Sequence, residues 1–284
     1  MTKNEQKWLV LLFSLKELNG GDKRSIVLNY INNNHYWYKN DHNDVFLESR
    51  NELVWRNDFS YERQHLVEKG YMKHDTQGRW EITPNGLIFL NNLISKVFNN
   101  NFKKYYTVNF FKKINQNQEI NEIEEDQILI DNLSNLDNNF DLNQNILLNQ
   151  PIPIDSNYKR TKRGSSYMRS AAISKRALDR ANNLCEIDPG HKSFIRKNTN
   201  KLYMEPHHLI PMKLTDYYGV VLDREQNIFS LCSNCHNQIH YGKDEDIRSL
   251  LNILYKARKE EINSIIGKDI SIEELYEIYN VKTP

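Results

Sequence analysis

YMEPHHLIPM (residues 203–212), followed closely by REQNIFSLCSNCHNQIHYG (residues 224–242), is the stretch of sequence that decides the fold of the C-terminal half of the chain. It holds four of the nine histidines and two of the three cysteines, together with Asn227. Imidazole can both ligate a divalent metal and accept a proton near neutral pH. This concentration of residues therefore predicts a site of chemistry, carried by a strand, a loop and a helix.

The cysteines predict a structural zinc site. Cys232 and Cys235 form a Cys-x2-Cys knuckle, and structural zinc takes four nitrogen or sulfur ligands in a tetrahedron. Cys185 is the third cysteine, and the fourth ligand is His191 or Asp188, with imidazole the better competitor in a thiolate-rich site. The alternative for Cys185 is a small buried apolar residue.

The histidines predict a second site. His207 and His208 are adjacent, so on a strand their side chains point in opposite directions, and one can bind a metal while the other faces a reacting water. His236 and His240 are four residues apart, which places both on one face of a helix. The alternative is a second metal site with a purely structural role.

This order of a histidine pair, Asn227 and a second histidine pair resembles the HNH nuclease family, whose core is the ββα-metal motif. The resemblance covers about residues 165–245, and Asn227 lies nine residues before His236, as the family spacing requires. It departs from the common zinc-bearing pattern, because no second cysteine follows Cys185 in Cys-x2-Cys spacing. That departure leaves the fourth zinc ligand open and does not affect the histidines.

The resemblance implies a role for each residue. His208 would be the general base that deprotonates the attacking water, and Asn227 would fix the loop that orients it. Glu205 matches an acidic catalytic position of some family members. One catalytic divalent cation, Mg²⁺ or Mn²⁺, would be held by His207 and His236, with His240 completing the set or touching the scissile phosphate. A cation of this kind polarises the phosphoryl oxygen and stabilises the leaving oxygen.

Residues 1–95 predict a separate domain. Helical apolar patterns lie at residues 7–18 and 52–69, and between them Asp22 can cap a second helix that runs through residues 26–31. The third helix stops at Gly70. Two short strands then meet at residues 75–78, before a last apolar helix. Three helices followed by a β-hairpin is the order of a winged helix.

The segment LVWRNDFSYERQHLVEKGYMKHDTQGRWEITPNG (residues 53–86) resembles the winged-helix domain of Mrr-type restriction proteins. Within its helix, Trp55, Phe59 and Leu66 form an apolar stripe typical of a core. The remaining helix surface predicts contacts to DNA bases and phosphates, made by Arg56, Asn57, Ser60, Tyr61, Arg63 and Gln64, with Lys73 and Arg79 on the wing. The alternative is an ordinary solvated face.

Residues 96–160 are rich in asparagine and acidic residues and predict a linker, and residues 161–284 form the nuclease domain with trailing helices. The fold class is therefore α+β. No apolar run approaches the roughly 20 residues that span a bilayer, so no membrane is expected. Three cysteines with one metal knuckle suit a reducing compartment, the cytoplasm.

The combined pattern predicts a type II-like restriction endonuclease that cuts double-stranded DNA at a site chosen by the winged helix. A requirement for a modified base is left open. A single site of this type cuts one strand, so cleavage of both strands predicts a homodimer. The alternatives are a non-enzymatic, zinc-containing DNA-binding regulator, and a phage or toxin HNH nuclease of low specificity.

Overall fold

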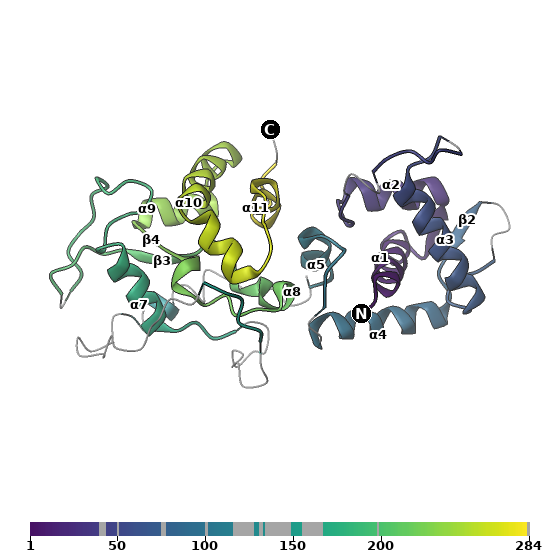
Figure 1. Ribbon diagram of the computed structural model, residues 1–284, viewed down its shortest axis with the longest axis horizontal. Coiled ribbons are helices and arrows are strands. Elements are labelled where there is room, and N and C mark those ends of the chain that lie inside the picture. The colour runs from purple at the N-terminus through teal and green to yellow at the C-terminus, as the bar shows by residue number, and fades with distance from the viewer. Residues whose placement is uncertain are drawn as a thin grey trace. The chain divides into compact units, whose positions relative to one another are not determined.

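The computed structural model describes residues 1–39, 44–49, 51–74, 78–99, 102–115, 128–130, 133, 149–154, 167–197 and 199–282. The chain forms two compact units, Met1–Asn117 and Gln118–Pro284. Each unit combines helices with a two-stranded antiparallel sheet (Figure 1), as the α+β prediction requires. Among the described residues, no helix combines the length and the apolar character needed to cross a bilayer.

The first unit is built around one buried helix. Its elements are α1 (Lys3–Glu17), β1 (Gly21–Lys23), α2 (Arg24–Asn33), α3 (Val54–Glu68), β2 (Arg79–Glu81), α4 (Pro84–Asn99) and α5 (Val108–Ile114). A capping box between Thr2 and Glu5 starts α1. Four consecutive residues, 9–12, are fully buried because α1 packs against α2, α3 and α4.

The small sheet of this unit differs from the expected hairpin. β2 pairs with β1, in the register Gly21↔Glu81, and residues 71–74 contribute the single bridge Met72↔Ile82 in the described part. The sequence of β1, Gly-Asp-Lys, carries no strand signal. Gly21 is required there, since a Cβ atom would lie 2.4 Å from the carbonyl oxygen of Trp80. The winged-helix interpretation stays a prediction.

The first unit continues past residue 95. The side chain of Gln6 in α1 donates to the carbonyl of Lys103 and accepts from the backbone of Tyr105, both at 2.8 Å. Tyr106 pairs with Trp37 and is fully buried. These contacts hold α5 on the unit. Most of the predicted linker, including its acidic part, lies outside the described residues, as do residues 161–166 of the predicted nuclease domain.

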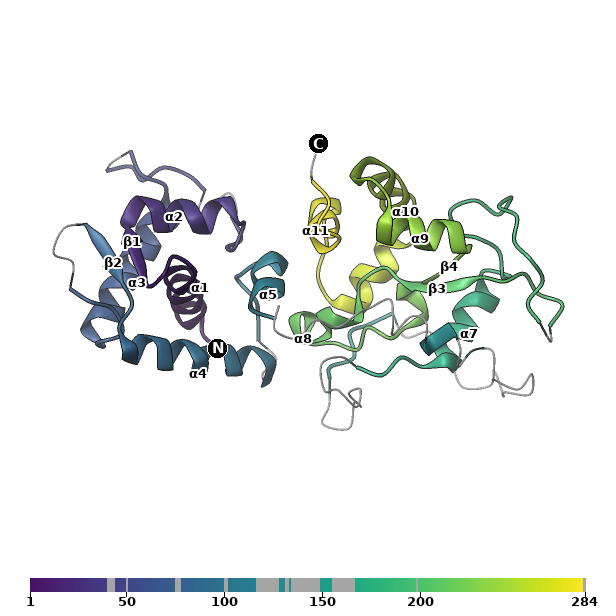
Figure 2. The ribbon, with the colours of Figure 1, turned by 180° about the vertical axis from the view of Figure 1, so that it is seen from behind.

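The second unit places a strand pair between helices. Its elements are α7 (Ala171–Arg180), β3 (Glu205–His208), η1 (Met212–Leu214), α8 (Thr215–Tyr218), η2 (Glu225–Asn227), β4 (Ile228–Leu231), α9 (Ser233–Tyr241), α10 (Asp244–Ile266) and α11 (Ile272–Ile278). β3 and β4 are antiparallel, with His207 opposite Phe229, and every residue of both strands is buried. In Figures 1 and 2, α7 and α9 lie on opposite sides of this pair, and both pack on it.

A buried arginine fastens α10 to the start of β4. Arg258 has non-helical backbone angles inside α10, and its guanidinium donates to the carbonyls of Glu225 at 2.8 Å and Ile228 at 2.7 Å. It also pairs with the carboxylate of Glu186, which accepts from the backbone of Ser230 at 2.7 Å. One guanidinium therefore fixes β4 relative to the segment beside Cys185.

Candidate metal centres and active site

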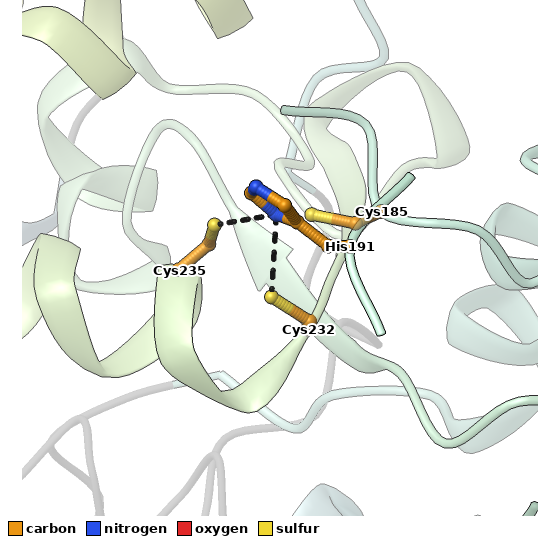
Figure 3. A group of neighbouring side chains, drawn as sticks. All are labelled: Cys185, His191, Cys232 and Cys235. Atoms are coloured by element: carbon orange, nitrogen blue, oxygen red, sulfur yellow. Dashed lines mark hydrogen bonds between the residues drawn. The ribbon is translucent and has the colours of Figure 1, made fainter. Parts of the chain in front are cut away.

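Three cysteines and one histidine converge in the second unit (Figure 3). The ligand atoms of Cys185, His191, Cys232 and Cys235 all lie within 4.8 Å of one another. The Nδ1 atom of His191 is 3.3 Å from the sulfur of Cys235 and 3.6 Å from that of Cys232. Asp188, the alternative fourth ligand, is outside this group, and its carboxylate accepts from a backbone N–H of its own turn. One nitrogen and three sulfurs form a donor set that can hold structural zinc.

The thiols of this cluster differ in acidity. Burial alone would raise the pKa of Cys185, but backbone N–H groups and the His191 ring outweigh that effect and lower it. Burial raises the pKa of Cys235, and the neighbouring thiols raise it further. Such a cluster keeps protons on some sulfurs when no cation is bound. A cation would displace those protons, which is the usual chemistry of thiolate zinc sites.

A second cluster joins β3 to α9. His207, His236 and His240 each offer a nitrogen, and these atoms lie within 4.8 Å of one another. The His207 ring centroid is 5.2 Å from that of His236 and 5.4 Å from that of His240. The two Nε2 atoms of His236 and His240 are 3.4 Å apart. The structure thus brings together the three histidines that the sequence assigned to one cation.

Hydrogen bonding fixes the tautomer of His207. Its Nε2 atom lies 2.8 Å from the hydroxyl of Tyr279, and that hydroxyl donates to the carbonyl of Leu209 at 3.0 Å. A hydroxyl that donates to a carbonyl accepts from the ring, so Nε2 carries the proton. The lone pair is therefore on Nδ1, which is buried and has no hydrogen-bond partner in the described part of the chain. Burial, followed by the charges of the other histidines, holds the pKa of His207 well below its usual value, and the ring is neutral.

Glu205 fixes the tautomer of His236. Its carboxylate lies 2.6 Å from Nδ1 of His236 and accepts from the hydroxyl of Ser233 at 2.7 Å. Burial would raise the pKa of Glu205, but these two hydrogen bonds outweigh burial and lower it. An ionised carboxylate accepts, so Nδ1 of His236 donates and its Nε2 atom presents a lone pair toward His240. Glu205 thus lies behind the histidine cluster and orients one of its members.

His208 faces a carboxylate that the sequence reasoning missed. Its Nε2 atom is 2.9 Å from Oδ1 of Asp223, and the two side chains are 3% and 4% exposed. The other oxygen of Asp223 accepts from the backbone of Ser170, the N-cap of α7, at 2.7 Å. The carboxylate fixes the proton of His208 on Nε2 and leaves the lone pair on Nδ1. His208 and His207 therefore point to different partners, as adjacent strand residues must.

A pocket opens beside these side chains. It is lined by His207, His208 and His240, and by the cationic side chains of Arg169 and Lys213. Two cations beside a histidine cluster suit an anionic ligand such as a phosphate. Nothing in the spacing of the sequence distinguishes Arg169, Lys213 or Asp223 from other charged residues, so no pattern could have found them.

Asn227 ties together the two segments that flank the strand pair. It is fully buried. Its side-chain oxygen accepts from the backbone N–H of Ile210 at 2.8 Å. Its side-chain NH₂ group donates to the carbonyl of Ile210 at 2.8 Å and to that of Leu222 at 3.0 Å. Its own carbonyl accepts from Leu209 at 2.9 Å. The geometry matches a residue that holds the chain directly after His208. Its functional role stays a prediction.

The predicted DNA-contacting residues of α3 do not all share one exposed face. Tyr61, at 64% exposure, and Gln64 are exposed, whereas Arg56, Asn57 and Ser60 are half-buried. Arg56 lies over the ring of Trp55 and donates to Asn29 at 3.0 Å.

Arg63 was placed on the wrong face by the sequence reasoning. It is 9% exposed, and its guanidinium donates to the carbonyl of Lys73 at 3.0 Å, so it braces the chain after α3. A helical pattern of polar residues cannot reveal that a nearby carbonyl will capture one of them. Lys73 and Arg79, which the sequence predicted to lie on a wing, are exposed, and both pair with Glu81.

Comparison with known proteins supports a relation to restriction enzymes. No family model matches the chain. Over 89 residues the chain is 29% identical to a restriction enzyme. That relative is the type IV methyl-directed restriction enzyme EcoKMcrA of Escherichia coli strain K12, and the aligned stretch covers 31% of this chain and 29% of the enzyme.

Proposed function

We propose that this protein is a restriction-type DNA endonuclease that hydrolyses phosphodiester bonds with one divalent cation at a ββα-metal site. The observation that carries the proposal is the convergence of three imidazole nitrogens, with two of the three rings lining the same pocket as a carboxylate-paired histidine. The resemblance of the sequence motif to the HNH family and the similarity to a restriction enzyme both support it. The order β3, β4, α9 is the order that such a motif requires.

His207, His236 and His240 would hold the catalytic cation. The cation supplies charge stabilisation to the phosphoryl and leaving oxygens when it is bound. The donor set fits, because the protons of the first two rings are committed to Tyr279 and Glu205, which leaves a lone pair on the other nitrogen of each ring. Imidazole donors favour Mn²⁺ over Mg²⁺, which prefers oxygen ligands and keeps its waters.

His208 would act as the general base. Asp223 keeps its proton on Nε2, so the lone pair is on Nδ1, a buried atom, and this nitrogen would take the proton from water. Asp223 is in this scheme a positioning residue, and Asn227 holds the backbone on which His208 is mounted. Arg169 and Lys213 would bind the phosphate on which the water acts.

The first unit would choose the DNA site. Tyr61 and Gln64 are the most exposed of the predicted contacts on α3, and Arg56, Asn57 and Ser60 lie beside them. A winged helix that presents α3 to a groove accounts for these side chains. Because the similar restriction enzyme is methyl-directed, dependence on a modified base is the first property of the DNA site to test. Cleavage of both strands would need two copies of the chain.

The experiment is cleavage of methylated and unmethylated plasmid with Mg²⁺ or Mn²⁺, using the wild type and His208→Asn. The asparagine has no ring nitrogen that can act as the base, so cutting should fall by at least about 100-fold. His35→Asn is the matched control, since His35 is exposed and has a positive φ of 51° that asparagine tolerates. Equal cutting by wild type and His208→Asn would refute the assignment of the base.

The same experiment decides between the alternatives. A DNA-binding regulator would shift the migration of DNA without cutting it under any cation. A nuclease of low specificity would cut methylated and unmethylated plasmid at many positions and equal rates.

A further inference from the structure

A basic hairpin links the cysteine cluster to the catalytic strand. Its sequence, KSFIRKNTNKLY (residues 192–203), has four cationic side chains and no acidic one. It begins directly after His191 and ends two residues before Glu205, the first residue of β3. This segment, which we name the basic finger, is not used by the chemistry described above.

The described residues of the basic finger, 192–197 and 199–203, form two arms. The bridge Ile195↔Leu202 joins its arms, and the backbone of Arg196 donates to the carbonyl of Lys201 at 2.9 Å. In both Figure 1 and Figure 2 the loop at this point of the colour scale extends outward from the rest of the second unit. Hydrogen bonds between the arms therefore hold a projecting element in shape.

The finger presents large apolar side chains to solvent. Phe194 is 62% exposed and Ile195 is 55% exposed. The ring of Phe194 stacks on Tyr203 with centroids 4.6 Å apart, and the Arg196 guanidinium lies 5.0 Å from the Tyr203 ring centroid. Exposed apolar groups that are fixed in position mark a contact surface. Exposed Lys192 and Lys197 lie on either side of them in the sequence.

Charge and apolar groups together indicate the partner. Cationic side chains beside exposed apolar ones are typical of proteins that bind phosphates and insert an apolar side chain into the minor groove. Not every cation is available for this, because Lys201 pairs with Asp179 and Arg196 donates to the carbonyl of Met204. Lys192 and Lys197 are the two that the hairpin presents outward.

We propose that the basic finger is a second DNA-binding element. Lys192 and Lys197 contact backbone phosphates, and Phe194 with Ile195 rests against sugars and base edges in the minor groove. This proposal rests on the proposed function, in that duplex DNA is the substrate. Because the finger begins at the cysteine cluster and ends at β3, a phosphate held here lies at a fixed distance from the cleavage pocket.

The test is binding of the full-length protein to a fluorescent DNA duplex over a salt series, in buffer without chelator or added divalent ions. The variant with both Lys192→Ala and Lys197→Ala should lower the magnitude of the slope of log K against log salt by about 1.8, at roughly 0.9 per lost phosphate contact. At 0.1 M salt that corresponds to about 60-fold weaker binding. A double variant with Lys256→Ala and Lys259→Ala, exposed on α10, makes the same change in charge and should leave the slope unchanged.

The variant Phe194→Ser tests the apolar side chain of the basic finger without changing its charge. It should weaken binding while leaving the salt slope as in the wild type. Its sedimentation should also match that of the wild type, and a changed oligomeric state would identify this side chain as a protein contact and overturn the proposal. If the wild type binds and cuts DNA but the double lysine variant has its full slope, the finger proposal fails alone. If the wild type neither binds nor cuts, the endonuclease proposal fails as well.

Discussion

Replacing Asp223 with asparagine should move the proton on His208 from one nitrogen to the other. The backbone of Ser170 donates to Oδ2 of Asp223, so the oxygen of the new amide must face Ser170. Its NH₂ group then faces Nε2 of His208, which is 2.9 Å from the carboxylate in the wild type. An NH₂ group donates, so Nε2 becomes the acceptor and the proton moves to Nδ1. The nitrogen assigned to accept the proton of water is then blocked.

The expected loss is that of general-base catalysis. Such catalysis contributes about 10²- to 10⁴-fold, which corresponds to roughly 3–5 kcal/mol in the activation barrier. The substitution keeps the size of the side chain and its bond to Ser170, so folding and DNA affinity should change little. The loss should therefore appear in kcat, with KM near the wild-type value.

Single-turnover cleavage of plasmid DNA measures the rate, and ¹⁵N chemical shifts of the histidine rings report which nitrogen carries the proton. Asp216→Asn is the matched control. Its carboxylate accepts from the hydroxyl of Tyr167 at 2.8 Å, so the same chemical change occurs in the same unit. If Asp223→Asn cuts within twofold of the wild type, or if its His208 ring keeps the proton on Nε2, the tautomer argument is wrong.

Three further predictions concern the metal sites and the stability of the second unit. Cys235→Ser should lose bound zinc in elemental analysis, whereas His240→Ala should retain it; equal zinc in both would contradict the assignment of the cysteine cluster. Arg258→Met should lower the free energy of unfolding by about 3–5 kcal/mol in urea denaturation, because it leaves buried partners unpaired. The control is Arg180→Met, which removes an exposed ion pair and should lower the free energy of unfolding by about 1 kcal/mol or less. The buried neutral ring of His207 has a lowered pKa, so below about pH 6.5 the unfolded chain binds a proton that the folded chain does not. Without added divalent ions, His207 should then have no effect on the free energy of unfolding above that pH. Below it, the free energy of unfolding should fall by up to about 1.4 kcal/mol per pH unit. The variant His207→Asn should lack this contribution to the pH dependence.

The two side-chain clusters could be predicted because their spacing is local. Cys232 and Cys235 on one turn, and His236 and His240 on one helix face, converge whatever the rest of the fold does. His191 also follows Cys185 closely, which brought it into the predicted cluster. In each of these cases backbone geometry over a few residues fixes the positions of the donor atoms.

The partners that orient these clusters could not be predicted, because they come from distant segments. Asp223 reaches His208 from the loop before η2, and Tyr279 reaches His207 from the end of α11. One-dimensional spacing does not specify such contacts. The same limit explains β1, whose pairing with β2 depends on close packing at Gly21.

Neighbouring positions of α9 contribute to both clusters, and this links the structural site to the chemistry. Cys235 belongs to the cysteine cluster and His236 to the histidine cluster, on a helix of 9 residues. A helix that short is marginal without tertiary contacts. Its position is set at one end by the cysteines and along its face by Glu205, which bonds both Ser233 and His236. In the proposed enzyme, loss of the structural metal would therefore displace His236 relative to His207, and activity would fall before the unit unfolds.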